Sequence, residues 1–279
     1  MKIGFIVHPD LRGMSLEEVV TWGKSHGFDA IDVWPGMENV QEICAKHDME
    51  IGAVGGGGNI FTEDPDELTK AIDAYKKGID RAAEIEAQVF MTLLRSMDKS
   101  KSTAENFNTF AEVFGPVIEH AERRGVKIAV ENCPFVGTNL AYSPEIWRHM
   151  FEVFPSDNFG LCFDPSHLVW LGIDYLRALR EFGNRVFYAH AKDTEILSEG
   201  LYDYGILDKV FDKKSEWDSG WWRYRLPGLG KVDWARFISL LAEIGYDGII
   251  SIEHEDPVYE GTAELTKKGL ILGQRHISQ

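Results

Sequence analysis

The sequence has few cysteines, few basic residues and no long apolar run. Its 279 residues include three cysteines, Cys44, Cys133 and Cys162, without paired spacing. That argues against a disulfide framework and favours a reducing compartment. No segment approaches the roughly 18 uninterrupted apolar residues of a membrane span, and the apolar start over 1–7 is too short for a signal-peptide core. We therefore expect a cytoplasmic protein without a membrane partner.

Basic residues are outnumbered by acidic ones. The chain has 29 Lys and Arg against 45 Asp and Glu, a formal net charge of -16, which repels phosphate backbones. We therefore expect no nucleic-acid partner. Hydrophobic residues make up 44% and charged residues 27% of the chain, which suits a globular core and excludes disorder.

Short apolar runs alternate along the chain with longer amphipathic stretches, which predicts strands alternating with crossover helices. The eight apolar runs are Ile3–Val7, Ala30–Trp34, Ile51–Val54, Val89–Leu94, Val126–Glu131, Phe159–Asp164, Val186–Ala191 and Ile249–Glu253. The eight helical patterns are Leu16–His26, Met37–His47, Pro65–Glu86, Ala104–Arg124, Pro144–Phe154, Ile173–Phe182, Trp234–Ile244 and Glu264–Ile271. Eight β/α units in about 250 residues predict an α/β fold, a (β/α)8 TIM barrel. We find no interdomain linker and expect a single domain over 1–279.

Two loops stand out from this rhythm. The glycines of Gly55–Gly58 are not followed by Lys-Ser/Thr or by a helix, so we interpret them as a βα loop near the barrel mouth and not as a phosphate loop. The segment 194–232 exceeds the usual connection length and holds Trp217, Trp221 and Trp222. It is either a lid over the mouth that stacks on a polyol, or a minidomain or subunit contact; the last would make the chain a homo-oligomer.

Polar residues end the last four predicted strands. Successive side chains of a strand alternate between its two faces, and the apolar set faces the helices. The alternation directs four polar side chains into the barrel: Glu131, Asp164, His190 and Glu253. Each stands at the C-terminal end of its strand, where barrel active sites are built.

Three carboxylates and an imidazole at one mouth would repel one another strongly unless a positive charge lay between them. We therefore predict a divalent cation. Ligation by oxygens and one nitrogen favours Mn²⁺, with Mg²⁺, Co²⁺ or Zn²⁺ as alternatives. The competing interpretation is four separately satisfied side chains, for example Glu131 paired with Lys127.

Several stretches make the chain resemble the xylose isomerase-like barrel superfamily, specifically the sugar phosphate isomerase/epimerase group. They are Val130-Glu131-Asn132, Phe163-Asp164-Pro165-Ser166-His167, His190-Ala191-Lys192-Asp193, Arg225-Leu226-Pro227-Gly228, Val232-Asp233-Trp234, Gly245-Tyr246-Asp247-Gly248 and Ser251-Ile252-Glu253. The resemblance implies that Glu131, Asp164, His190 and Glu253 are the metal ligands. It also implies that His167 and Arg225 contact substrate hydroxyls or a carbonyl, and that Glu131 and Glu253 act as catalytic acid and base.

Other residues are candidates for substrate binding, each with an alternative. His167 either enters the mouth or caps the next helix, and we favour the mouth. Asp193 either orients a ligand or is an exposed loop acid. His8 stands on the correct rim, although Pro9 and Asp10 also fit an ordinary turn, and Trp34 either lines a sugar pocket or is core. Cys133 and Cys162 are interpreted as small buried packing residues.

The sequence therefore predicts an enzyme: a divalent-metal-dependent isomerase or epimerase of a small sugar or polyol, which removes a proton next to a metal-chelated carbonyl. The alternative is a metal-dependent lyase or dehydratase that acts on a keto-sugar, keto-glycoside or inosose by β-elimination. An abasic-site endonuclease is opposed by the acidic charge balance. A sugar-binding barrel without catalysis would hold no divalent ion even after manganese is supplied.

Overall fold

A computed structural model describes residues 1–207 and 219–279. Eight parallel strands close into a barrel in the order β1-β10-β7-β6-β5-β4-β3-β2. The barrel strands are β1 (Lys2–Ile6), β2 (Ala30–Val33), β3 (Glu50–Gly55), β4 (Val89–Thr92), β5 (Ile128–Glu131), β6 (Phe159–Phe163), β7 (Val186–Ala191) and β10 (Ile249–Ile252). The predicted (β/α)8 barrel is confirmed, with each predicted apolar run forming one strand.

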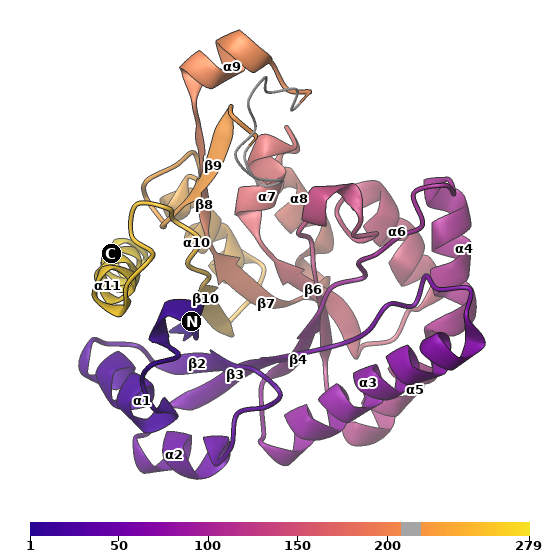
Figure 1. Cartoon of the computed structure of the whole chain (residues 1–279), viewed down its shortest axis with the longest axis horizontal. Helices are drawn as coiled ribbons and strands as arrows, with labels where there is room; N and C mark the ends of the chain where they lie inside the picture. Colours follow the sequence, from indigo (N-terminus) through magenta and orange to yellow (C-terminus); the bar gives the residue numbers. More distant parts are fainter. Residues whose placement is uncertain (208–218) are drawn as a thin grey trace.

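Helices surround the barrel (Figure 1). They are α1 (Leu16–Ser25), α2 (Val40–Lys46), α3 (Pro65–Glu84), α4 (Thr103–Val113), α5 (Gly115–Arg124), α6 (Pro144–Val153), α7 (Pro165–Trp170), α8 (Tyr175–Phe182), α9 (Ser198–Tyr204), α10 (Trp234–Glu243) and α11 (Ala263–Ile277). Three short 3-10 turns are η1 (Pro9–Leu11), η2 (Phe135–Gly137) and η3 (Gly183–Arg185). Among the described residues, no helix combines the length and apolar character that crossing a membrane requires.

Some predicted elements differ from the structure. The pattern Ala104–Arg124 is two helices, α4 and α5, because Pro116 cannot donate the backbone hydrogen bond that a continuous helix needs. The last helix runs on to Ile277, since Gly269 and Gly273 pack against neighbouring side chains without ending it. A helix that was not predicted, α7, follows β6 at once. It begins where the Asp164 side chain accepts a hydrogen bond from Ser166 N.

The segment after β7 contains a hairpin. Strands β8 (Asp193–Ile196) and β9 (Trp222–Arg225) pair antiparallel, and together with α9 they project from one end of the barrel (Figure 1). The Trp222 ring stacks on Trp170 of α7, with ring centroids 4.5 Å apart. Within the described residues, two strands and a short helix thus form part of the segment that was predicted to be an elaborated loop. Trp217 of the same segment lies outside the described residues.

Alternation along the strands separates two cores, as predicted. Phe159, Leu161 and Phe163 of β6 pack in the large core between the barrel and its helices, whereas Cys162 lies in a small cluster inside the barrel. Tyr188 of β7 shares that inner cluster. Its hydroxyl donates to the buried Asp32 carboxylate, which also accepts from Ser251 Oγ at 2.6 Å. Because Tyr188 faces the barrel interior, His190, two residues further along β7, faces the interior as well.

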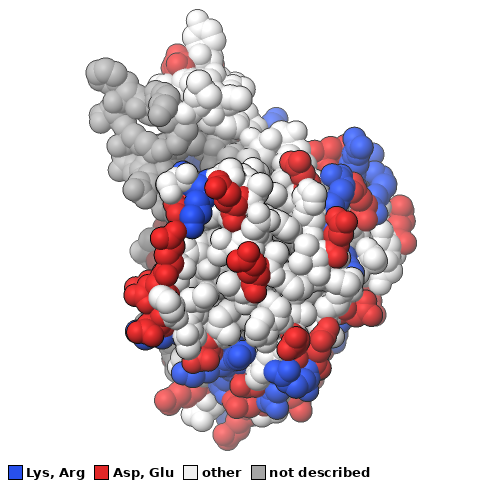
Figure 2. Space-filling view, turned by 90° about the vertical axis from the view of Figure 1, so that its right-hand side faces the viewer, with Lys and Arg blue, Asp and Glu red and all other residues white. Residues whose placement is uncertain are grey.

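The negative charge is not concentrated on the face in Figure 2, which is the right-hand side of Figure 1. Acidic and basic side chains intermingle there around a largely uncharged centre. This face therefore offers no continuous basic footprint of the kind that binds nucleic acid.

Candidate metal centre

The four predicted ligands come together at the C-terminal mouth of the barrel. Glu131 ends β5, Asp164 follows β6, His190 lies in β7 and Glu253 follows β10, and these four strands are consecutive neighbours in the barrel. One ligand atom from each side chain lies within 4.8 Å of those of the other three. The sequence-derived prediction of a convergent group is therefore met in its geometry, and ligation itself stays a prediction.

Histidines lie between the carboxylates of this group. Glu131 Oε1 is 3.3 Å from both His167 Nε2 and His190 Nδ1, and His190 Nδ1 is 3.1 Å from Glu253 Oε2. Burial alone would raise the pKa of Glu131, but hydrogen bonds to the two histidines hold it well below its ordinary value. Glu131 is thus negatively charged and able to bind a cation. The alternative pairing with Lys127 is wrong, because the Lys127 ammonium lies over the Phe187 ring.

The residues present fit a divalent ion. Asp164 is fully buried, and its Oδ1 caps α7. Within the described residues Asp164 Oδ2 accepts no hydrogen bond, although His167 Nε2 and Lys192 Nζ lie 3.3 and 3.4 Å away. A buried carboxylate oxygen without a hydrogen bond, beside two further carboxylates, is what a cation would satisfy. Three carboxylates and one imidazole suit Mn²⁺, Mg²⁺, Co²⁺ or a catalytic Zn²⁺.

Lys192 is a site residue that the sequence analysis missed. It is 1% exposed, and its Nζ lies 2.6 Å from Glu253 Oε2 and 2.9 Å from Glu255 Oε2. Burial lowers the pKa of Lys192, but the surrounding carboxylates raise it well above its ordinary value, so the side chain stays cationic. Its position two residues after His190, on the same strand face, was the signal that could have identified it.

His167 enters the mouth, as favoured. It is fully buried in α7, its Nε2 faces Glu131 and Asp164, and its Nδ1 lies 2.7 Å from the Tyr224 hydroxyl. The helix-capping alternative is wrong, because the next predicted helix, α8, is capped by Asp174. Tyr224 belongs to β9, so the hairpin is hydrogen-bonded to a side chain that contacts two of the four convergent residues.

Arg225 and Asp193 form hydrogen bonds to residues other than the four convergent ones. Arg225 Nε donates to Asp256 at 2.8 Å and its Nη1 donates to Glu195 at 2.5 Å. Asp193 is fully buried at the base of the hairpin, so the alternative of an exposed loop acid is wrong. Its carboxylate accepts hydrogen bonds from backbone groups and from one indole, and the structure therefore places it in the support of the hairpin.

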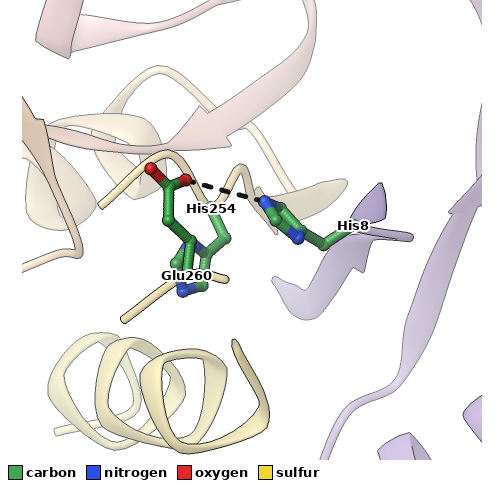
Figure 3. A group of neighbouring side chains, drawn as sticks. All are labelled: His8, His254 and Glu260. Atoms are coloured by element: carbon green, nitrogen blue, oxygen red, sulfur yellow. Dashed lines mark ion pairs between the residues drawn. The ribbon is translucent and has the colours of Figure 1, made fainter. Parts of the chain in front are cut away.

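His8 and Trp34 stand on the rim, as predicted. His8 Nδ1 accepts from Asp10 N at 3.1 Å, which makes the predicted turn, and its Nε2 lies 3.9 Å from Glu260 Oε2. Figure 3 shows His8 facing Glu260, with His254 beside them. Burial lowers the pKa of His254 to about 4, so this ring is neutral. Trp34 is 45% exposed, which contradicts the core alternative.

A cavity of about 780 Å³ opens over the metal centre. Its wall includes Glu131 and Glu253 of the centre, Lys192, and the aromatic residues Trp222 and Tyr224 of the hairpin. A volume of this size, with convergent polar groups on an aromatic wall, is typical of a small-molecule site. The segment for which a lid and a minidomain or subunit contact were alternatives thus contributes a side wall to the mouth.

Cys133 also lines this cavity, so its interpretation as a buried packing residue is wrong.

The three cysteines are expected to differ in reactivity. Burial raises the pKa of the Cys44 thiol to about 11 and that of Cys162 to about 12, which leaves both unreactive near neutral pH. We expect a disulfide reagent such as DTNB to label one thiol rapidly in the native chain and all three cysteines after denaturation. A Cys133→Ser variant should lose the rapid phase. Rapid labelling of the Cys133→Ser variant by DTNB would contradict the assignment of Cys133 as the accessible thiol.

Known proteins are similar to this chain in sequence and in fold. An inosose isomerase of Bacillus velezensis is 24% identical, covering 96% of this chain and 94% of that protein. An inosose dehydratase of Clostridium perfringens is 26% identical, covering 93% and 90%. The uncharacterized protein YfiH of Bacillus subtilis is 36% identical, covering 50% of this chain and only 44% of that protein. The crystal structure of IOLI protein with a binding zinc atom superposes with a TM-score of 0.72 at 21% identity, covering 100% of this chain and 95% of that one.

The chain is a (β/α)8 barrel with four convergent polar side chains at its C-terminal mouth. The sequence pattern of the family described as Xylose isomerase-like TIM barrel matches residues 20–272. The chain belongs to this family, as its motifs predicted.

Proposed function

We propose that this protein is a divalent-metal-dependent isomerase or epimerase of a sugar or polyol. The observation that carries the proposal is the pair Glu131 and Glu253, two carboxylates from different strands that border one cavity beside Asp164 and His190. The similarity to an inosose isomerase over nearly the whole chain supports it. Among the ions that fit, we propose Mn²⁺, because oxygen donors predominate.

A bound divalent cation would polarise a substrate carbonyl and so stabilise the negative charge that develops when the neighbouring carbon loses its proton. The residues of this chain perform the proton transfer. The Glu253 side chain is 20% exposed and that of Glu131 is 6% exposed, so Glu253 is the more open to substrate. We assign the first proton abstraction to Glu253. Glu131 is an anion, so the proton that it returns to the substrate comes from His167, which lies 3.3 Å away and whose pKa is raised to about 10.

Two cationic or proton-bearing groups assist this transfer. Lys192 Nζ, next to Glu253, places a positive charge where negative charge develops on the substrate oxygen. His167 is held by Tyr224 and faces Glu131, so it orients that carboxylate for protonation of the opposite face. The Tyr224 contact makes the hairpin part of this arrangement.

The test is metal analysis of the purified chain, followed by a panel of sugars and ketosugars incubated in D₂O and analysed by mass spectrometry. We expect about one equivalent of a divalent ion and a substrate that gains one deuterium without losing any other mass. A chain that retains no ion after manganese is supplied, or that exchanges no proton in any sugar, would reject the proposal.

A lyase is the second candidate. The similarity to an inosose dehydratase and the aromatic wall of the large cavity favour it, because β-elimination begins with the same proton abstraction and the wall suits a bulky substrate. The same mass spectra distinguish the two reactions, since isomerisation changes the mass of the substrate only by the incorporated deuterium, whereas elimination releases water or an alcohol.

A further inference from the structure

The mouth contains a second cavity. It measures about 430 Å³ and shares Leu93, Glu131 and Glu253 with the cavity of about 780 Å³. We call the larger one the hairpin lobe, bounded by Lys192 and Trp222, and the smaller one the tryptophan lobe. Small-molecule sites range from roughly 300 to 1,000 Å³, so each lobe is by itself large enough for a ligand. The two carboxylates that we assign to proton transfer stand where the lobes meet.

The tryptophan lobe is defined by Trp34 and the wall Gly55–Gly58. Trp34 Nε1 donates to Val7 O at 3.2 Å, which fixes the indole while the ring stays 45% exposed. Its edge lies over Gly55, where an added Cβ would be 3.4 Å from the ring. The Trp34 side chain is therefore a positioned aromatic surface at the mouth.

The glycine wall is flat for a steric reason. A Cβ on Gly57 would lie 2.6 Å from Thr92 Oγ1, and a Cβ on Gly58 would lie 2.7 Å from the backbone of Ala71. Gly57 also has a φ of +123°, which L side chains rarely adopt. The loop thus packs directly on α3 and β4 and extends no side chain from these positions into the space beside Trp34. The glycine run, interpreted from the sequence as a βα loop near the barrel mouth, therefore lines this lobe with backbone.

The two lobes differ in chemistry. Away from the shared carboxylates the hairpin lobe carries the charged Lys192, Arg223 and Glu255. Among the described residues, the tryptophan lobe has neutral polar groups such as Asn59 and one basic residue, Arg95, whose guanidinium lies over the Phe135 ring. An aromatic face with hydrogen-bonding groups at its edge suits a sugar ring, which has C–H faces and a hydroxyl rim.

We propose that the substrate has two linked rings. The oxidised ring lies at Glu131 and Glu253 and reaches toward Lys192, and a second sugar ring packs on Trp34 in the tryptophan lobe. This inference rests on the proposed function, which places a sugar beside the two carboxylates. It narrows the substrate class to a keto-glycoside of at least two rings.

The test is titration calorimetry of the Mn²⁺-loaded full chain with glucose and with cellobiose, in which two glucose rings are linked. We expect cellobiose to bind about tenfold more tightly than glucose. Trp34→Ala should remove most of this preference, whereas Trp34→Phe, which keeps a flat aromatic ring, should retain it. Equal dissociation constants for the two sugars, or a Trp34→Ala variant with the preference intact, would overturn the inference.

A parallel measurement separates this inference from the proposed function. Deuterium exchange from solvent into 3-ketoglucose and 3-ketocellobiose follows the proton abstraction. Exchange without a preference for two rings would keep the isomerase and reject the two-ring substrate. A clear cellobiose preference with no exchange in either ketosugar would reject the isomerase and keep the two-ring site.

Discussion

A Glu253→Gln variant is expected to exchange deuterium into a ketosugar about a hundredfold to ten-thousandfold more slowly than the parent chain, with its fold retained. Glutamine has nearly the shape of glutamate but cannot accept the proton. Glu253 has the most exposed side chain of the four convergent residues, and it borders both lobes of the mouth. Mass spectrometry of the ketosugar in D₂O measures the exchange rate.

The matched control is Glu264→Gln on α11, whose side chain is 88% exposed. This substitution changes the net charge equally and should leave the exchange rate within about twofold of the parent. Circular dichroism and the Tm of both variants establish that they fold. Exchange at the parental rate in a folded Glu253→Gln variant would contradict the assignment of this residue as the base.

The barrel and its convergent residues were predictable because both depend on local periodicity. Each buried parallel strand is an apolar run, and alternation within a run decides which side chain faces the barrel interior. Glu131, Asp164 and Glu253 end such runs and His190 is next to last in its run, so their convergence required only that neighbouring strands end at one mouth. Lys192 obeys the same alternation, but it lies one residue beyond the predicted run, which ends at Ala191.

The hairpin could not be predicted in the same way. Strand β8 reads Asp-Thr-Glu-Ile and β9 reads Trp-Arg-Tyr-Arg, so neither is an apolar run, and 25 residues (197–221) separate them. Their stability comes from partners elsewhere in the fold, including Trp170 under Trp222 and His167 beside Tyr224. Contacts between residues this far apart leave no periodic signal in the sequence. The hydrogen bond from Arg225 to Asp256 could not be predicted for the same reason.

An Asp193→Ala variant is expected to lose about 3 to 5 kcal/mol of the free energy of unfolding. Asp193 is fully buried. Its Oδ1 accepts from Thr194 N at 2.8 Å and Val232 N at 2.9 Å, and its Oδ2 accepts from Gly228 N at 3.0 Å and Trp234 Nε1 at 2.9 Å. Alanine would leave these donors buried without their acceptor. Urea denaturation followed by circular dichroism measures the change.

Two further variants make this expectation specific. Asp193→Asn keeps the volume and one acceptor oxygen, so it should be less destabilising than Asp193→Ala, and Asp203→Ala at an exposed position should change the free energy by no more than about 0.5 kcal/mol. The four donors lie at both ends of the segment that connects β7 to α10. Loss of the Asp193 carboxylate should therefore also loosen the hairpin that holds Tyr224 against His167. Asp193→Ala should therefore slow ketosugar exchange as well as lower stability. A loss below about 1 kcal/mol would show that the four donors find other partners, and Asp193 would then not be the residue that ties the hairpin to the barrel.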